Sequence, residues 1–187
     1  MAEKHLNEKF IDALKYMNTT MKADIKAGHQ WKYCNTTSKK AKNFAQARSQ
    51  GKYLINCVDG VQWALKIAGV PAKALSWYGG DGKIVWCNSS AKAEAKKYFD
   101  IISTKGKSVA QLYKAGLLCD GDILLGYKGC HHTNAYVGGG KSFDSGGAWA
   151  HGSGEGAKFT KWIGALAHKS MHPVYILRLK DRAHYIV

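Results

Sequence analysis

The chain of 187 residues is 45% hydrophobic and 11% aromatic, which supplies enough apolar material for a buried core and excludes an intrinsically disordered protein. No stretch approaches the roughly 18 consecutive apolar residues of a membrane-spanning helix, so we expect no membrane insertion. Twenty-eight basic residues against 13 acidic ones give a net charge of +15, which favours a polyanionic partner such as nucleic acid, anionic lipid or the anionic polymers of a bacterial cell wall.

We expect one domain over residues 1–187, with a helical N-terminal part at 1–50 and a core at 51–187. The N-terminus contains no apolar signal region, which predicts synthesis in the cytoplasm without a signal peptide. The five cysteines are an odd number and form no Cys-x-x-Cys pair, so we expect free thiols in a reducing compartment. They are Cys34, Cys57, Cys87, Cys119 and Cys130.

Helical periodicity dominates the first part of the chain. Apolar residues recur at three- and four-residue spacing from Leu6 to Ile25 and predict a long amphipathic helix that ends near Gly28. Further helices are predicted over residues 40–50, 91–102, 108–115 and 159–166. The glycine-rich segment 76–86 is expected to be a loop or a hairpin, whose aromatic residues either line a cleft or anchor the segment to the core.

Short apolar runs in the second part predict consecutive strands over residues 122–126, 133–137, 141–144 and 174–179. A tight turn at Gly138–Gly140 joins the second of these strands to the third. The glycine-rich segment 145–156 is too long for a simple connection and is a candidate rim of a cleft, or else a mobile surface loop. Helices followed by a block of strands predict an α+β fold with a mostly antiparallel sheet.

The segment around Cys57 is a candidate site for nucleophilic chemistry. Asn56 is a good N-cap, the following residues have helical spacing, and Gly69 and Pro71 end the pattern. Cys57 therefore falls in the first turn of a helix, where unpaired N–H groups and the helix dipole favour a thiolate. Asp59, two residues later, either opposes that thiolate or serves the helix N-terminus.

A cysteine nucleophile requires a base and a group that orients the base. His131 and His132 stand at the entry to a predicted strand, where side chains alternate, so only one of them can face inward. Counting back from the glycine turn, His132 and Asp144 fall opposite each other on neighbouring strands. The sequence therefore predicts a Cys57, His132 and Asp144 arrangement.

These residues resemble the NlpC-type cell-wall cysteine peptidases, which are papain-like proteins of bacteria and bacteriophage lysins. The resemblance rests on the cysteine at a helix start, on Gly121-Asp122, and on the spacings from His132 to Tyr136 and to Asp144. It covers residues 56–144 and implies Cys57 as nucleophile, His132 as general base and acid, and Asp144 as the orienting residue. Tyr33 matches an upstream tyrosine that supports the oxyanion in that family.

The match has departures, and two other motifs give alternatives. The family usually has Cys-Ser-Gly, whereas Cys57-Val-Asp is closer to the related CHAP amidases. Residues 135–142 satisfy a relaxed phosphate-loop pattern, but no helix can follow it. Zinc ligation is the second alternative, although its residues lack the paired spacing of structural sites, so we expect no metal and no cofactor. Its candidate ligands are Cys119, Cys130, His131 and His132.

The resemblance implies a peptidoglycan hydrolase that cleaves an amide bond in the cell-wall peptide, as in a bacteriophage endolysin that acts on the wall after release. The positive charge would hold such an enzyme on teichoic acids. A papain-like effector toxin, acyltransferase or deamidase that acts on intracellular proteins shares the same triad. A basic nucleic-acid-binding module is compatible with the charge, although the sequence contains no helix-turn-helix, zinc finger or aromatic platform.

Overall fold

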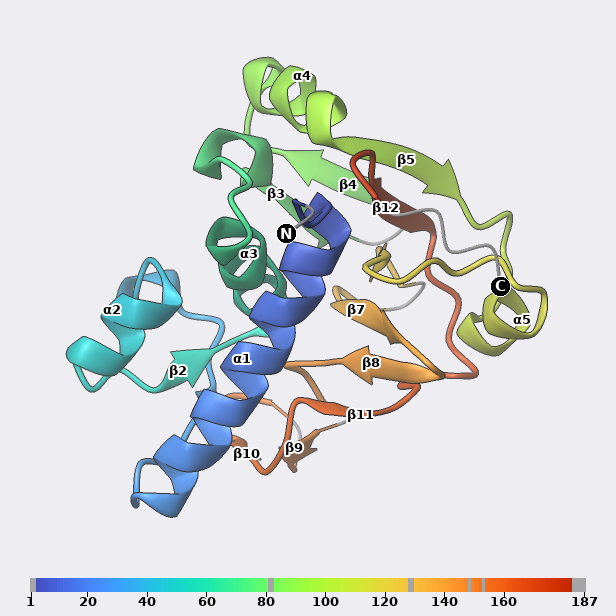
Figure 1. Cartoon of the computed structure of the whole chain (residues 1–187). Helices are drawn as coiled ribbons and strands as arrows, with labels where there is room; N and C mark the ends of the chain where they lie inside the picture. Colours follow the sequence, from blue (N-terminus) through green and yellow to red (C-terminus); the bar gives the residue numbers. More distant parts are fainter. Residues whose placement is uncertain (1–2, 81–82, 128–129, 148, 153, 183–187) are drawn as a thin grey trace.

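The structure is a computed structural model that describes residues 3–80, 83–127, 130–147, 149–152 and 154–182. These residues form an α+β fold whose sheets are mostly antiparallel, as predicted (Figure 1). Within the described ranges, the helices are α1 (Leu6–Lys26), α2 (Phe44–Ser49), α3 (Cys57–Ile67), α4 (Ser89–Tyr98) and α5 (Val109–Lys114), with 3-10 helices η1 (Thr37–Lys39) and η2 (Ala72–Leu75).

The strands form a six-stranded sheet, a four-stranded sheet and a separate hairpin. The six-stranded sheet has the order β11 (Ile163–Ala165), β8 (Lys141–Phe143), β7 (Thr133–Gly138), β6 (Ile123–Leu125), β12 (Tyr175–Leu179) and β5 (Phe99–Ser103), with every pair antiparallel. The four-stranded sheet has the order β2 (Leu54–Ile55), β1 (Lys32–Tyr33), β10 (Lys158–Phe159) and β9 (Ala150–His151). The hairpin pairs β3 (Trp77–Gly80) with β4 (Lys83–Trp86).

Side-chain alternation along the six-stranded sheet supplies two apolar cores. Ile123 and Leu125 of β6 point into the main core, whereas Leu124 between them joins a smaller cluster with Val109 and Leu112 of α5. The apolar stripe of α1 enters the main core, and α1 contacts α3, which in turn lies against β7. One face of the sheet is therefore covered by α3 at β7, and α1 packs against α3 (Figure 1).

Three of the predicted helices are wrong in part or in whole. The helix predicted over residues 91–102 ends at Tyr98, because residues 99–103 pair with β12 as β5. The helix predicted over residues 159–166 is absent, since β10 and β11 occupy its two ends as strands of two different sheets. The helix predicted over residues 40–50 is shorter and begins at Phe44, after the N-cap Asn43.

Both glycine-rich segments contain β-strands. Segment 76–86 is the β3–β4 hairpin, with residues 81–82 outside the described part of the chain; Trp77 is buried in the core, whereas Tyr78 is exposed. Segment 145–156 contains β9, which pairs with β10, while residues 148 and 153 lie outside the described ranges.

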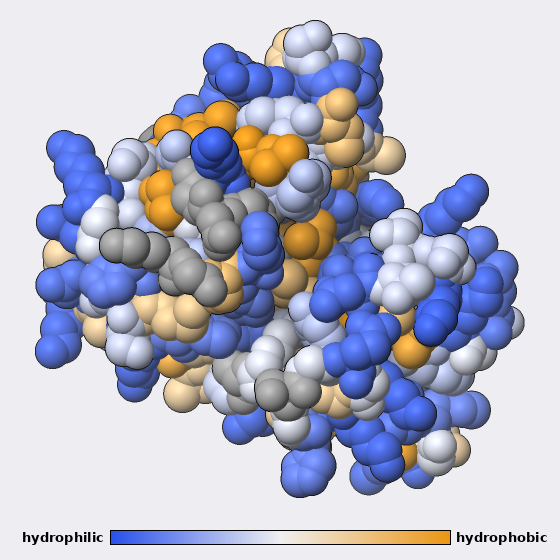
Figure 2. All heavy atoms as spheres, turned by 180° about the vertical axis from the view of Figure 1, so that it is seen from behind, coloured by the Kyte–Doolittle hydropathy of each residue, from blue (hydrophilic) through white to orange (hydrophobic). Residues whose placement is uncertain are grey.

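The surface seen from behind is mostly hydrophilic, and the hydrophobic residues on this face lie mainly in its upper part and extend toward the middle (Figure 2). None of the helices described is both long enough and apolar enough to span a membrane. All five cysteines lie in described residues, and none is in a disulfide.

Candidate active site

Cys57 is the first residue of α3, and the start of this helix is held by a capping box. The Asn56 side chain accepts a hydrogen bond from the Asp59 N–H at 2.9 Å, and the Asp59 carboxylate accepts from the Asn56 N–H at 3.2 Å. Cys57 is 4% exposed, and its Sγ donates to the His131 carbonyl oxygen at 3.8 Å. The cysteine is thus fixed at a helix N-terminus, as the sequence predicts.

Asp59 serves the helix N-terminus, which is the second of the two interpretations given above. Besides its part in the capping box, its carboxylate lies 2.6 Å from Nζ of Lys40, whose side chain is only 5% exposed. Burial raises the pKa of Asp59, and the Lys40 ammonium offsets part of this rise. The negative charge of the Asp59 carboxylate is therefore paired with the buried Lys40 ammonium group.

The loop that follows β8 is attached directly to the start of α3. The Ser145 hydroxyl donates to the Asn56 carbonyl oxygen at 2.9 Å. Gly60 permits this contact, because a Cβ there would lie 2.3 Å from Ser145 Oγ and 2.9 Å from a ring carbon of Phe143. A glycine three residues after the cysteine thus lets α3 approach the end of β8, which Asp144 follows directly.

His132 and Asp144 meet across the β7–β8 hairpin. The register pairs Ala135 with Phe143, and three glycines at 138–140 take positive φ values in and beside the turn. His132 is 8% exposed while His131 is exposed, so alternation selects the histidine that faces inward. Nε2 of His132 lies 3.4 Å from Oδ2 of the fully buried Asp144.

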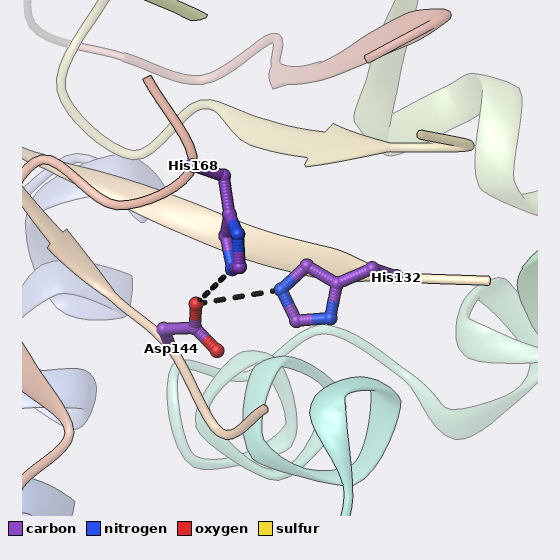
Figure 3. A group of neighbouring side chains, drawn as sticks. All are labelled: His132, Asp144 and His168. Atoms are coloured by element: carbon purple, nitrogen blue, oxygen red, sulfur yellow. Dashed lines mark hydrogen bonds and ion pairs between the residues drawn. The ribbon is translucent and has the colours of Figure 1, made fainter. Parts of the chain in front are cut away.

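Charge within the site favours a protonated His132 beside an ionised Asp144. Burial lowers the pKa of His132, but hydrogen bonding to Asp144 and Cys57 and the charges of both outweigh it and raise the pKa to about 10. Burial raises the pKa of Asp144, but His132 and His168 together hold it well below its usual range. Figure 3 shows Nε2 of His132 directed at Asp144, with the other ring nitrogen on the side away from the carboxylate.

His168 also belongs to this site, and the sequence gives no indication of it. Its Nε2 lies 2.6 Å from the same Oδ2 of Asp144, and its ring meets the His132 ring edge-on with centroids 4.5 Å apart (Figure 3). Two contacts position it: Ser142 Oγ accepts from the Ala167 N–H at 2.9 Å, and the buried Tyr127 ring lies beside both imidazoles.

Tyr33, which the family resemblance suggested for the oxyanion, lies on β1 near the thiol. Burial raises the pKa of Tyr33 to about 12, and the charge of a Cys57 thiolate adds to the rise. β1 pairs in parallel with β2, which leads directly into Asn56 and Cys57. The short four-stranded sheet therefore brings the phenol to the cysteine from a distant part of the sequence.

An open cavity of about 430 Å³ gives access to Cys57. Its lining residues are Asn35, Thr37, Lys40, Asn56, Cys57, Val58, Asp59, Tyr78 and His131. Segment 145–156 supports one wall, because the Glu155 carboxylate accepts from the Asn35 N–H at 2.8 Å. The exposed Tyr78 lines this cavity while the neighbouring Trp77 is buried, so the aromatic residues of the hairpin have both of the roles considered from the sequence.

A second and larger cavity of about 630 Å³ shares Thr37, Lys40 and Asp59 with the first. Its lining adds Lys42, Lys52 and Lys66, so it is strongly basic, but it does not include Cys57. The smaller cavity is the candidate site, because it contains the thiol. The larger one extends the cleft with positive charge.

The zinc site that was considered as an alternative from the sequence does not form. Among the described residues, the one group of at least three side chains suited to a metal is His132, Asp144 and His168, which excludes Cys119, Cys130 and His131. The relaxed phosphate-loop segment 135–142 forms the β7–β8 hairpin, which offers no helix N-terminus to a phosphate.

No family model matches this chain, and comparisons with curated proteins and with solved structures also give no match.

Proposed function

We propose that the protein is a papain-like cysteine hydrolase that cleaves an amide bond in the peptide part of bacterial peptidoglycan, in the manner of a bacteriophage endolysin. One observation carries this proposal. The cysteine at the N-terminus of α3 contacts a buried histidine, and this histidine contacts a buried aspartate. The cysteine also lines a cavity. The three residues supply the nucleophile, base and orienting group that amide hydrolysis requires.

The proposed reaction begins at Cys57. The thiolate attacks the carbonyl carbon, a C–S bond forms, and the π electrons move to the carbonyl oxygen. The N–H groups of Cys57 and Val58 belong to the first helical turn, where a helix leaves its N–H groups without intrahelical partners, and they can donate to this oxyanion. The Tyr33 hydroxyl supplies a further donor from β1.

His132 then protonates the leaving nitrogen as the C–N bond breaks, which leaves an acyl group on the Cys57 sulfur. A water molecule gives a proton back to His132 and attacks the acyl carbon, and the C–S bond breaks to release a carboxylic acid. Asp144 keeps the imidazole oriented throughout and stabilises its positive charge. These steps need no cofactor.

The positive charge of the protein supports an anionic polymer of the bacterial cell wall as the substrate. The chain carries a net charge of +15, and lysines at positions 40, 42, 52 and 66 line the basic cavity beside the thiol. Peptidoglycan peptides carry free carboxylates, and teichoic acids carry phosphates, so both would be attracted to this surface. We therefore place the activity at the cell wall after release of the enzyme from the cell that makes it.

The proposal is tested with purified Gram-positive cell walls. The wild-type protein should reduce the turbidity of the suspension and release peptide fragments with new amine and carboxyl ends, detected by mass spectrometry, whereas Cys57→Ala should do neither. Cys87→Ala removes an exposed thiol outside the cavity and is the matched control. Undiminished clearing by Cys57→Ala would exclude this cysteine as the nucleophile. Absence of clearing by the wild type would favour an intracellular protein as the substrate.

A further inference from the structure

Three side chains in the site converge on one point. Nε2 of His132 and Nε2 of His168 both face Oδ2 of Asp144, at 3.4 Å and 2.6 Å (Figure 3). All three ligand atoms lie within 4.8 Å of one another. Cysteine hydrolysis as proposed above uses one histidine on this carboxylate, so it leaves the second histidine unexplained.

The hydrogen bonding of this group is incomplete although it is buried. Oδ1 of Asp144 is buried without a hydrogen-bond partner among the described residues, and Nε2 of His132 has only its long 3.4 Å contact with Oδ2 of Asp144. The side chains of Asp144 and His132 are 0% and 9% exposed, and that of His168 is 16% exposed. Buried polar atoms without partners are rare in folded proteins and often mark a site for an ion or a water molecule.

The ligand atoms suit a zinc-like ion. Zinc binds histidine nitrogen at about 2.0–2.1 Å and carboxylate oxygen at about 2.0–2.2 Å, so neighbouring ligands of a tetrahedral ion lie about 3.3 Å apart. The distance between His132 and Asp144 already fits this value, whereas the His168 nitrogen would have to withdraw from the carboxylate by about 0.7 Å. Two imidazoles favour zinc over calcium or magnesium, which prefer oxygen ligands.

The surroundings hold the ligands in place. The Tyr127 ring lies 5.4 Å from the His132 ring and 5.6 Å from the His168 ring, and its hydroxyl donates to Asn134 at 2.7 Å. The bond between Ala167 and Ser142 fixes the chain immediately before His168 to β8. Supporting contacts of this kind keep metal ligands oriented in known sites.

We propose that His132, Asp144 and His168 form a binding site for a zinc-like divalent transition-metal ion, and that the bound ion switches off the Cys57–His132 pair. The inhibitory half of this proposal rests on the proposed function, and the binding half does not. Binding of the ion to Nε2 releases the proton from that nitrogen and leaves a neutral ring with its remaining proton on Nδ1, so His132 can no longer accept a proton on the side of the thiol. The same ion occupies the carboxylate that orients the ring.

The binding half is tested by competition between metal-free protein and a chromophoric zinc chelator. His168→Asn removes one ligand and retains a residue type that tolerates the positive φ of 53° at this position. The matched control is His172→Asn, because His172 bonds instead to the Gly106 carbonyl oxygen. We expect one zinc ion per wild-type chain, at least about tenfold weaker binding by His168→Asn, and wild-type binding by His172→Asn. Equal zinc affinity in His168→Asn and the wild type would overturn the site.

The inhibitory half is tested by the rate at which iodoacetamide modifies Cys57, followed residue by residue by mass spectrometry. Zinc should slow modification of Cys57 in the wild type and in His172→Asn, chelation should restore the rate, and His168→Asn should need at least about tenfold more zinc for the same effect. If zinc binds without slowing modification of Cys57, the site is not inhibitory. Because neither measurement uses cell walls, failure of the hydrolase proposal and failure of this one give different results.

Discussion

Gly146 offers a test of the triad geometry that leaves every functional group chemically unchanged. A Cβ at this position would lie 2.4 Å from Cε1 of His132 and 3.0 Å from Oδ1 of Asp144. Ordinary contact begins at 3.4 Å, so Gly146→Ala must displace the His132 ring by about 1 Å, the difference between 3.4 and 2.4 Å. Gly146 has no positive φ, so the backbone accepts alanine and the effect is steric.

A displacement of about 1 Å in a catalytic group costs roughly 100-fold in rate. Overpacking of a filled interior costs about 1–3 kcal/mol in the free energy of unfolding. We therefore expect Gly146→Ala to clear Gram-positive walls about 100-fold more slowly than the wild type while it remains folded, as checked by thermal unfolding.

Gly147→Ala is the matched control, because a Cβ at Gly147 meets no atom within 4 Å and its φ is not positive. This variant should keep wild-type activity and stability. Equal clearing rates for the two variants would refute the reasoning, since they would show that the position of the His132 ring does not limit the reaction.

Two further predictions concern the oxyanion and the basic cavity. Tyr33→Phe removes one proposed donor and should lower kcat about 100-fold with little change in KM, measured on released wall peptides; an unchanged kcat would exclude Tyr33 from the oxyanion site. Lys52→Glu should weaken retention on cell walls at low salt, because Lys52 lines the basic cavity. Lys92→Glu makes the same charge change on the exposed face of α4, outside that cavity, so equal losses in the two variants would show that only net charge matters.

Local patterns in the sequence were sufficient to predict the helix and the hairpin that position the residues of the predicted triad. The start of α3 was predicted because Asn56 is a good N-cap that directly precedes residues with helical spacing. The pairing of His132 with Asp144 was predicted because a glycine turn fixes the register of the short hairpin around it. In both cases, contacts between residues near in sequence determine the structure.

Where the prediction was wrong, the structure of the segment depends on strand pairing between residues that are distant in the sequence. Phe159, Trp162, Ile163 and Leu166 have helical spacing, yet the chain divides there between two sheets, and Gly164 lies so close to Trp149 that a Cβ would meet its ring at 2.9 Å. His168 follows that segment, so its contact with Asp144 depends on how β11 pairs with β8. No local pattern contains that information.

The most direct test of the central claim is the rate at which each cysteine reacts with iodoacetamide at neutral pH, resolved by mass spectrometry in the wild type and in His132→Ala. Cys57 is 4% exposed and Cys87 is exposed, so exposure alone predicts that Cys87 reacts faster. If Cys57 is a thiolate held by His132, it will react faster than Cys87 in the wild type and lose that advantage in His132→Ala. Faster reaction of Cys87 in the wild type, or an unchanged Cys57 rate in His132→Ala, would contradict the account.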